Sequence, residues 1–369
     1  GVSYNAYVIS DQKNVLIDAA KDIKGDALLD QIAQVVDPSQ LDYIVINHME
    51  PDHTGVMRTL RRIAPETTLL CTRRAADLLE NYYQITDGVH VVSDGETLDL
   101  GDHELHFSLT PMVHWPETMV TYESEQGVLF SCDAFGGYGA LQGTVFDDQC
   151  TNLDFYEREA LRYYANIVAL FARPVLRAID KLEGLDIKVV APSHGLIWRE
   201  NPGRIIDLYQ QWADYAITGP ELGITLLYGT MYGNTEQMVE AVASGVGEAG
   251  VPLEIFDVRH IHASYILPSL YTKRGVLIGA PTYEGALFPP IAHVLDIAER
   301  KRIRSRNVGY FGSFGWSGGA RREIMEWAES LAWDLFEPAW EFPGGPTRES
   351  LREGKRLGYE FAQMLKDES

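Results

Sequence analysis

Short apolar runs alternate with amphipathic stretches in the first half of the chain. Four runs have the length and apolar content of strands: residues 6–9, 15–17, 89–92 and 105–109. Two longer stretches read as helices: residues 27–36 and 73–82. Strands and helices mixed in this way predict a sandwich of sheets flanked by helices.

The second half follows a different pattern, in which strands and helices alternate regularly. Strand-like runs occupy residues 222–228, 276–280 and 308–312, and a terminal helix is expected near residues 347–365. This order is typical of a doubly wound parallel sheet. A helical pattern that begins at Pro202 stops near residues 216–220, before the first of these strands. We therefore expect two domains, residues 1–217 and residues 221–369.

Potential metal ligands are concentrated directly after the apolar run at residues 43–46. His48, Glu50, Asp52 and His53 place two imidazoles and two carboxylates in one loop. If this loop stays extended, alternate side chains (48, 50 and 52) project to one side and His53 to the other. Four such residues in one loop favour a metal site over a plain polar loop.

Three further candidates lie beside apolar segments later in the chain: His114, Asp133 and His194. The last two directly follow the runs at residues 127–132 and 189–193. One ligand at the end of each strand is a common way to assemble a pocket from distant sequence. Each residue taken singly could instead be a turn or hydrogen-bonding residue. Together with the first cluster, they predict one metal centre.

A second candidate site follows the strand at residues 222–228 and leads into a helical pattern at residues 236–242. The loop between them contains Thr230, Met231, Tyr232, Gly233, Asn234 and Thr235. Hydroxyls, backbone N–H groups and a helix N-terminus would converge there, as a phosphate monoester requires. The loop has no Lys or Arg, so neutral donors would have to hold the phosphate. Gly and Thr after a strand also form plain turns, so the loop alone does not decide the matter.

Two later strand-to-loop units place aromatic residues among small polar ones. The first loop is Pro281, Thr282, Tyr283, Glu284 and Gly285, and the second is Ser313, Phe314, Gly315, Trp316, Ser317 and Gly318. An isoalloxazine ring needs flat walls and close backbone donors, which this composition offers. Ligands of open α/β sheets bind outside the carboxyl ends of the strands. Ordinary packing is the alternative for either aromatic residue taken singly.

Composition narrows the possible functions. The formal charge of −22, from 53 acidic and 31 basic residues, argues against binding to nucleic acid or an anionic membrane. No apolar run is long enough to cross a bilayer, and the first residues lack a signal-peptide pattern. Cys71, Cys132 and Cys150 form no CxxC pair, so this sequence contains no rubredoxin-type cysteine site. We expect a cytoplasmic enzyme.

The order His-x-Glu-x-Asp-His at residues 48–53, followed by single His, Asp and His residues, resembles the metallo-β-lactamase-like module of flavodiiron proteins. The resemblance extends over nearly the whole chain, including residues 133–136, 146–148 and the loop at residues 229–235. It implies an α/β protein, with an N-terminal metallo-β-lactamase-like αββα sandwich followed by a C-terminal flavodoxin-like doubly wound sheet. Zinc hydrolases of the first fold have a second His where this chain has Glu50, and carboxylate-rich sites suit iron better.

The resemblance also implies the ligands of two non-haem irons. One ion would be held by His48, Glu50 and His114, the other by Asp52, His53 and His194, and Asp133 would bridge them. The loops at residues 230–235, 281–285 and 313–318 would hold FMN. Tyr163 or Tyr164 would reach the substrate pocket, although packing in the core is an equal alternative for both. Family members carry a further segment before residues 4–7, and we expect its outer strand and one pocket-lining group to lie outside this numbering.

The activity implied is that of an oxidoreductase. Electrons would pass from FMN to the di-iron centre, which would reduce dioxygen to water, nitric oxide to nitrous oxide, or both. The donor would be rubredoxin, another flavoprotein or a reduced deazaflavin, and the assembly a head-to-tail homodimer, possibly a dimer of dimers. Two alternatives stay open on sequence grounds: a di-zinc hydrolase with a flavodoxin-like passenger, and a flavin electron-transfer module with a vestigial metal site.

Overall fold

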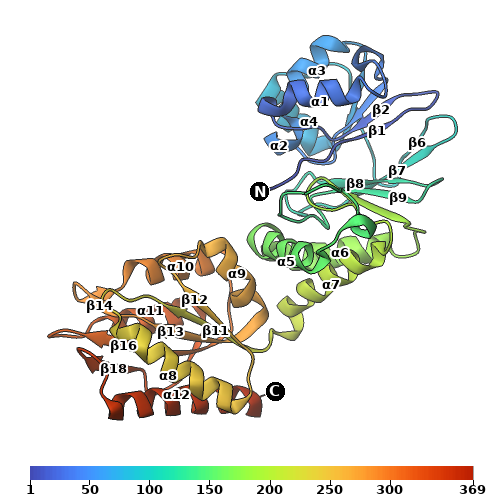
Figure 1. The fold of residues 1–369 in the computed structure, drawn as a ribbon. Helices are drawn as coiled ribbons and strands as arrows, with labels where there is room; N and C mark the ends of the chain where they lie inside the picture. Colours follow the sequence, from blue (N-terminus) through green and yellow to red (C-terminus); the bar gives the residue numbers. More distant parts are fainter. Residues whose placement is uncertain (369) are drawn as a thin grey trace. The chain divides into compact units, whose positions relative to one another are not determined.

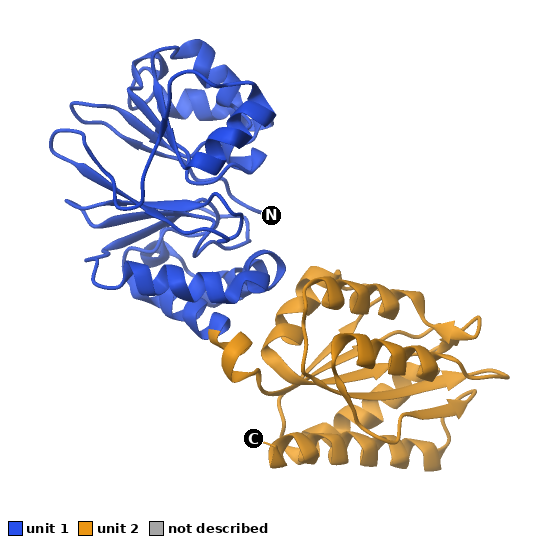
Figure 2. Cartoon of the chain, turned by 180° about the vertical axis from the view of Figure 1, so that it is seen from behind, with its two compact units in different colours: residues 1–213 blue, residues 214–369 orange. Residues whose placement is uncertain are grey.

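The structure, a computed structural model, describes residues 1–368 and divides into two compact units. The first unit ends at Ala213 and the second begins at Asp214, inside helix α7 (Pro202–Thr218) (Figure 2). The predicted boundary at residues 217–221 lies slightly further along the chain and stays a prediction. Within residues 1–368, no helix is both long and apolar enough to cross a membrane.

The first unit contains two five-stranded sheets. The first sheet has the order β1-β2-β3-β4-β5, with β1 antiparallel to β2 and the other pairs parallel. Its strands are β1 (Tyr7–Ile9), β2 (Val15–Ile17), β3 (Tyr43–Val45), β4 (Thr68–Cys71) and β5 (Val89–Val91). The second sheet has the order β10-β9-β8-β7-β6, with only β9 and β10 parallel. Its strands are β6 (Thr97–Asp99), β7 (Glu104–Leu109), β8 (Met119–Glu123), β9 (Val128–Cys132) and β10 (Val189–Pro192).

Alternation of side chains along the strands produces two separate cores. Leu16 and Ile44 pack with the buried faces of the helices that follow the first strands. Their neighbours Val15, Ile17 and Val45 instead belong to a second core, which includes residues of the second sheet. Successive side chains of a strand point to opposite faces, so one short apolar run serves both cores. This is the layered sandwich that the sequence predicted.

Helices cover both outer faces of the sandwich (Figure 1). The helices of this unit are α1 (Gly25–Ile32), α2 (Pro51–Thr54), α3 (Met57–Ile63), α4 (Arg73–Tyr83), α5 (Leu153–Tyr163), α6 (Ala172–Leu182) and the first part of α7. Short 3₁₀ turns lie at Asp22–Lys24, Pro38–Gln40, Asp147–Gln149 and Ala169–Phe171, and a π-helical turn at Tyr164–Val168 continues α5. Figure 1 shows α1, α3 and α4 beside the first sheet, and α5, α6 and α7 beside the second.

The second unit is built on one parallel sheet with the order β12-β11-β13-β16-β17. Its strands are β11 (Glu221–Tyr228), β12 (Leu253–Asp257), β13 (Lys273–Gly279), β16 (Asn307–Phe314), β17 (Asp334–Leu335) and β18 (Trp340–Pro343). Both β17 and β18 pair with β16, so the fifth position of the sheet is filled by two short strands in succession. A small hairpin of β14 (Thr282–Tyr283) and β15 (Ala286–Leu287) follows β13. The chain leaves β11 toward β12 and then returns to β13 on the other side, which creates a switch point between neighbouring strands.

Helices pack on both faces of this sheet, as the alternating pattern predicted. They are α8 (Asn234–Ala249), α9 (Ala263–Thr272), α10 (Pro289–Arg300), α11 (Ala320–Leu331) and α12 (Arg348–Asp367). Figure 1 shows α8 and α12 on one side and α9, α10 and α11 on the other. Met238 and Val242 of α8 pack with Leu357 and Phe361 of α12 in one core. The carboxyl ends of β11, β13 and β16 therefore lie side by side and carry the three predicted cofactor loops.

Candidate functional site

The seven predicted metal ligands meet at one end of the sandwich. The loop after β3 supplies His48 and Glu50, and helix α2, which follows it, supplies Asp52 and His53. The loops after β7, β9 and β10 supply His114, Asp133 and His194. The three strands β7, β9 and β10 run in the same direction, so their carboxyl ends lie at the same edge. Both sheets thus contribute ligands to one place.

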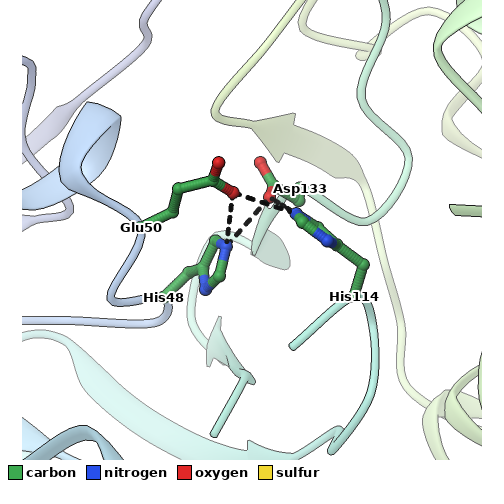
Figure 3. A group of neighbouring side chains, drawn as sticks. All are labelled: His48, Glu50, His114 and Asp133. Atoms are coloured by element: carbon green, nitrogen blue, oxygen red, sulfur yellow. Dashed lines mark hydrogen bonds and ion pairs between the residues drawn. The ribbon is translucent and has the colours of Figure 1, made fainter. Parts of the chain in front are cut away.

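The first group consists of His48, Glu50, His114 and Asp133, whose ligand atoms lie within 4.8 Å of one another (Figure 3). Nε2 of His48 is 3.3 Å from Oε2 of Glu50, and Nε2 of His114 is 3.2 Å from the same oxygen. Oδ2 of Asp133 lies 3.3 Å from His48 Nε2 and 3.0 Å from His114 Nε2. Two nitrogens and two oxygens therefore converge on one point.

The second group consists of Asp52, His53 and His194. Nε2 of His194 is 3.5 Å from Oδ2 of Asp52, and Nε2 of His53 is 3.4 Å from Oδ1 of Asp52. The other carboxylate oxygen of Asp133, Oδ1, lies 3.2 Å from the Nε2 atoms of both histidines. Asp133 thus presents one oxygen to each group, which is the arrangement that a bridging carboxylate requires.

Several of these buried ligand atoms face one another at ion-pair distance but form no hydrogen bond. They are Asp52 Oδ1, His53 Nε2 and Asp133 Oδ1. Burying a polar atom without a partner is costly, so such atoms usually face something that satisfies them. All three belong to the second group or to the shared carboxylate. A cation at this point would satisfy all of them.

The charges at the site favour ionised carboxylates. Burial raises the pKa of Asp133, but His53, His114 and His194 outweigh burial and hold that pKa well below its ordinary value. Hydrogen bonds from His114 and His48 lower the pKa of Glu50 to about 2. Both carboxylates are therefore anionic at neutral pH, which is the form that binds metal.

The turn that carries Asp133 has an unusual backbone. Cys132 and Phe135, which are not glycines, have φ values of 50° and 64°. The left-handed region is unfavourable for such residues, and it persists where the surrounding structure enforces it. The side chain of Ser131 helps, because its hydroxyl donates to the Ala134 carbonyl at 2.6 Å. This tight turn aims the shared carboxylate between the two groups.

The three predicted cofactor loops are neighbours in the second unit. The hydroxyls of Thr235 and Ser313 are 3.3 Å apart, which joins the first loop to the third. A Cβ atom added to Gly319 would lie 2.0 Å from the Gly285 carbonyl oxygen, so the second and third loops approach each other through bare backbone. Helix α8 begins at Asn234 without a side-chain cap, because Gly233 precedes it. Its first N–H groups are suited to an anion.

Large side chains on these loops are exposed to solvent. Trp316 is 94% exposed and Tyr232 is 85% exposed, and Met231 and Tyr283 are also exposed. Exposed aromatic side chains next to an uncapped helix fit a flat ring that carries a phosphate. Ser313 and Phe314 differ from the prediction in one respect: they belong to strand β16 itself, and the loop starts at Gly315.

Comparisons with known proteins agree with the division of the chain into two units. The model of the ODP family beta lactamases matches residues 2–195, and that of flavodoxins matches residues 226–354. The anaerobic nitric oxide reductase flavorubredoxin of Escherichia coli strain K12 is 35% identical over 374 residues, which cover 99% of this chain and 76% of that protein. The chain belongs to the flavodiiron protein family.

Solved structures of the family have the same fold. The rubredoxin oxygen:oxidoreductase of Desulfovibrio gigas superposes with a TM-score of 0.91 at 30% identity, covering 100% of this chain and 92% of that one. A flavo di-iron protein of Thermotoga maritima gives 0.86 at 30% identity, covering 100% and 90%. The predicted fold class is therefore confirmed. The family implies FMN and two irons, and the unpartnered ligand atoms and the uncapped helix α8 fit these groups.

The sequence places residues 48, 50 and 52 on one side only if the first ligand loop stays extended, and this condition is not met. Asp52 does not project to the same side as His48 and Glu50. It lies with His53 in the second group. The loop does not stay extended, because helix α2 begins at Pro51 and turns the chain. Proline favours the first position of a helix, so this turn was visible in the sequence.

Two partners of the ligands were missed. Nδ1 of His48 is 2.7 Å from Oε1 of Glu117, whose side chain is wholly buried, and this contact fixes the ring with Nε2 toward the first group. Nδ1 of His194 donates to the backbone carbonyl of Ser3 at 2.7 Å. Such contacts on the second ring nitrogen orient metal-binding histidines. Burial lowers the pKa of His48, but Glu117 and Glu50 outweigh burial and raise it to about 10.

Replacing Glu117 by glutamine tests this role. Glu117→Gln keeps the shape and an oxygen acceptor for His48 and for the Met49 N–H, but removes the charge. We expect iron affinity to fall by about tenfold or more, measured by competition with a chelator. Glu123→Gln is a matched control, because Glu123 is also buried and contacts Nδ1 of His103, away from the ligands. Equal affinity in both variants would contradict the role of Glu117.

The two candidate tyrosines have different surroundings. The ring of Tyr163 lies 5.7 Å from that of His194, and burial together with the Asp133 carboxylate raises the pKa of Tyr163 well above its ordinary value. Tyr164 packs against Tyr209 and Trp212, at ring distances of 5.1 and 5.5 Å. The structure thus brings Tyr163 to the ligand cluster and places Tyr164 among core aromatics.

Proposed function

We propose that this chain is an oxidoreductase that takes electrons through FMN and reduces dioxygen to water, nitric oxide to nitrous oxide, or both, at a di-iron centre. The observation that carries the proposal is that Asp133 divides the other six ligands into two groups, one facing each of its oxygens. The proposed ligand sets are His48, Glu50 and His114 for one ion and Asp52, His53 and His194 for the other. Related proteins are named for reduction of nitric oxide and for oxidation of rubredoxin by oxygen.

Residues of the chain would hold the ions and leave one side of the site accessible from the surface. When bound, FMN would supply electrons, and the irons would act as Lewis acids that bind and reduce the gas. Glu117 and the Ser3 carbonyl hold His48 and His194 in place from behind. The Glu50 side chain is 38% exposed, whereas His48 and Asp133 are buried, so the first group opens to the surface beside Glu50. We propose that the gas enters there and that Tyr163 lines the inner wall.

The alternatives raised by the sequence are less well supported. A hydrolase with two zinc ions would not explain a carboxylate, Glu50, between the two histidines of the first group. A vestigial site would not explain why all seven ligands converge. Membership of the flavodiiron family favours the oxidoreductase over both.

Measurement of gas consumption in an otherwise anaerobic assay distinguishes the proposed oxidoreductase from a zinc hydrolase. Reduced, iron-loaded protein should consume dioxygen, nitric oxide or both when each gas is supplied separately with an electron donor, and the products identify the preferred gas. Nitrocefin hydrolysis by zinc-loaded protein is the parallel assay for the hydrolase. If neither gas is consumed by protein that contains FMN and iron, the proposed function is wrong.

We further propose a head-to-tail homodimer in which the flavin of one chain serves the irons of the other. The exposed Trp316 and Tyr232 beside the cofactor loops support a partner surface there. Closed two-fold dimers are the commonest symmetric assemblies.

The proposed electron donor is rubredoxin, another flavoprotein or a reduced deazaflavin. The three cysteines carry no disulfide, which supports a reducing compartment such as the cytoplasm.

A mixed dimer tests this assembly. One chain would carry Asp133→Ala and the other Thr235→Glu, so that one intact flavin site and one intact iron site lie on different chains. We expect about half of the wild-type dimer activity, because one of the two crossed pairs survives. The control is each variant as a homodimer, which should be inactive. Inactive mixed dimers that retain one flavin and one iron pair would contradict transfer between chains.

A further inference from the structure

A positively charged side chain, Arg259, lies against the predicted phosphate loop, although the loop itself contains no Lys or Arg. Arg259 follows β12, the strand next to β11. Its Nη1 donates to the backbone carbonyl of Thr230 at 2.9 Å. Its Nε and Nη2 atoms bind the two carboxylate oxygens of Asp257, so the guanidinium is held on both sides. The sequence-based expectation that only neutral donors serve this loop therefore omitted a charge that the fold supplies.

The contact with Thr230 fixes the direction of a loop peptide. In a planar trans peptide, the carbonyl of Thr230 and the N–H of Met231 point in opposite directions. Because Arg259 binds this carbonyl, the N–H of Met231 is turned away from the guanidinium. The Thr230 hydroxyl accepts the N–H of Gly233 at 2.9 Å, which holds the far side of the loop. Arg259 thus fixes the start of the loop, next to β11, and the Thr230 hydroxyl connects that start to Gly233, which precedes helix α8.

The charge of Arg259 matters because its surroundings are acidic. The chain carries a formal charge of −22, which repels a phosphate monoester. Glu236 lies in the first turn of α8, and Asp257 lies at the end of β12. Arg259 brings a positive charge to the loop through its contact with Thr230, and a guanidinium keeps its charge at every physiological pH.

We propose that Arg259 is a positioning residue that makes this site selective for the phosphorylated flavin over riboflavin. The proposal rests on the proposed binding of FMN at this loop. By holding the Thr230 peptide and offsetting the acidic surroundings, Arg259 contributes to binding of the phosphate and not of the ring. Its loss therefore weakens FMN binding and leaves riboflavin binding unchanged.

Flavin titration of the full-length protein after removal of its flavin tests this proposal. FMN and riboflavin would each be titrated into wild type, Arg259→Gln and Arg259→Lys, with flavin fluorescence as the readout. We expect Arg259→Gln to weaken FMN binding about tenfold or more, as for loss of a charged hydrogen bond, with riboflavin unchanged. Arg259→Lys keeps the charge but cannot bind Asp257 and Thr230 with a planar guanidinium. Its FMN affinity should therefore lie between those of wild type and Arg259→Gln. FMN affinity should also depend more steeply on salt in wild type than in Arg259→Gln.

The control is Arg300→Gln, which breaks another Arg–Asp pair of the same unit, with Asp296, on helix α10. It should change neither affinity. Equal losses for FMN and riboflavin in Arg259→Gln would mean a purely structural role and would overturn the proposal, as would no loss for either flavin. If Arg259→Gln does not fold, the ratio of the two affinities in Arg259→Lys decides. None of these measurements uses gas turnover, so failure of the proposed function and failure of this inference are distinguishable.

Discussion

Asp133→Ala should lose most of its iron and nearly all of its gas-reducing activity. Each oxygen of Asp133 faces one ligand group, at 3.0 Å from His114 Nε2 and 3.2 Å from His194 Nε2. Removal of this side chain takes a ligand from both ions and leaves several buried histidines facing one another without their anion. Metal affinity depends on the number of ligands and their charge, so both ions should bind more weakly. Elemental analysis and turnover of the purified variant provide the measurement, against about two irons per wild-type chain.

The control for this variant is Asp147→Asn. Asp147 is also buried in the first unit, where it accepts backbone N–H groups of residues 199–201, and it contacts none of the seven ligands. This control should keep its iron even if its stability falls. Full iron in Asp133→Ala would refute the bridging role. Active wild-type protein with full zinc and no iron would refute the di-iron chemistry itself.

Thr235→Glu should abolish FMN binding. Thr235 is wholly buried at the second position of α8, and its hydroxyl lies 3.3 Å from that of Ser313. A glutamate there would add bulk and a negative charge at the point where the phosphate is expected, and both effects oppose an anionic ligand. We expect the purified variant to show no bound-flavin absorbance, even after reconstitution with excess FMN and removal of the unbound flavin, and to retain its iron.

A buried glutamate can also destabilise the unit, so two further variants accompany this test. Thr235→Val keeps the shape and removes the hydroxyl, and it should weaken FMN without unfolding the protein. Ser244→Glu adds the same charge at an exposed position of α8 and should leave flavin content unchanged. A folded Thr235→Glu protein that keeps one FMN per chain would place the cofactor elsewhere.

The sequence predicted those parts of the site that follow strands. His48, Asp133 and His194 were found because each comes directly after an apolar run, and the carboxyl ends of neighbouring strands meet. Glu117 and Arg259 were not found, because their roles depend on contacts across 69 and 29 residues that no local pattern encodes. The carbonyl of Ser3 is backbone and has no residue signature.

At two places the backbone departs from the simple pattern that the sequence suggests. Residues 48, 50 and 52 would share one side only in an extended loop, but helix α2 begins at Pro51 and places Asp52 with His53. At the end of β16, pairing with β18 extends the strand through Phe314, because Phe311–Phe314 are matched by Trp340–Pro343. That pairing joins segments distant in sequence, so the loop boundary could not be read from the composition of residues 313–319.

Because each ligand group takes side chains from both sheets of the sandwich, bound ions would fasten the two layers together. The loop after β3 belongs to one layer, and the loops that carry His114, Asp133 and His194 belong to the other. A ligand that binds only the folded state stabilises that state in proportion to its affinity and concentration. The iron-loaded chain should then unfold at a higher temperature than the iron-free chain, so the metal acts as a clamp between the layers as well as a reactive centre.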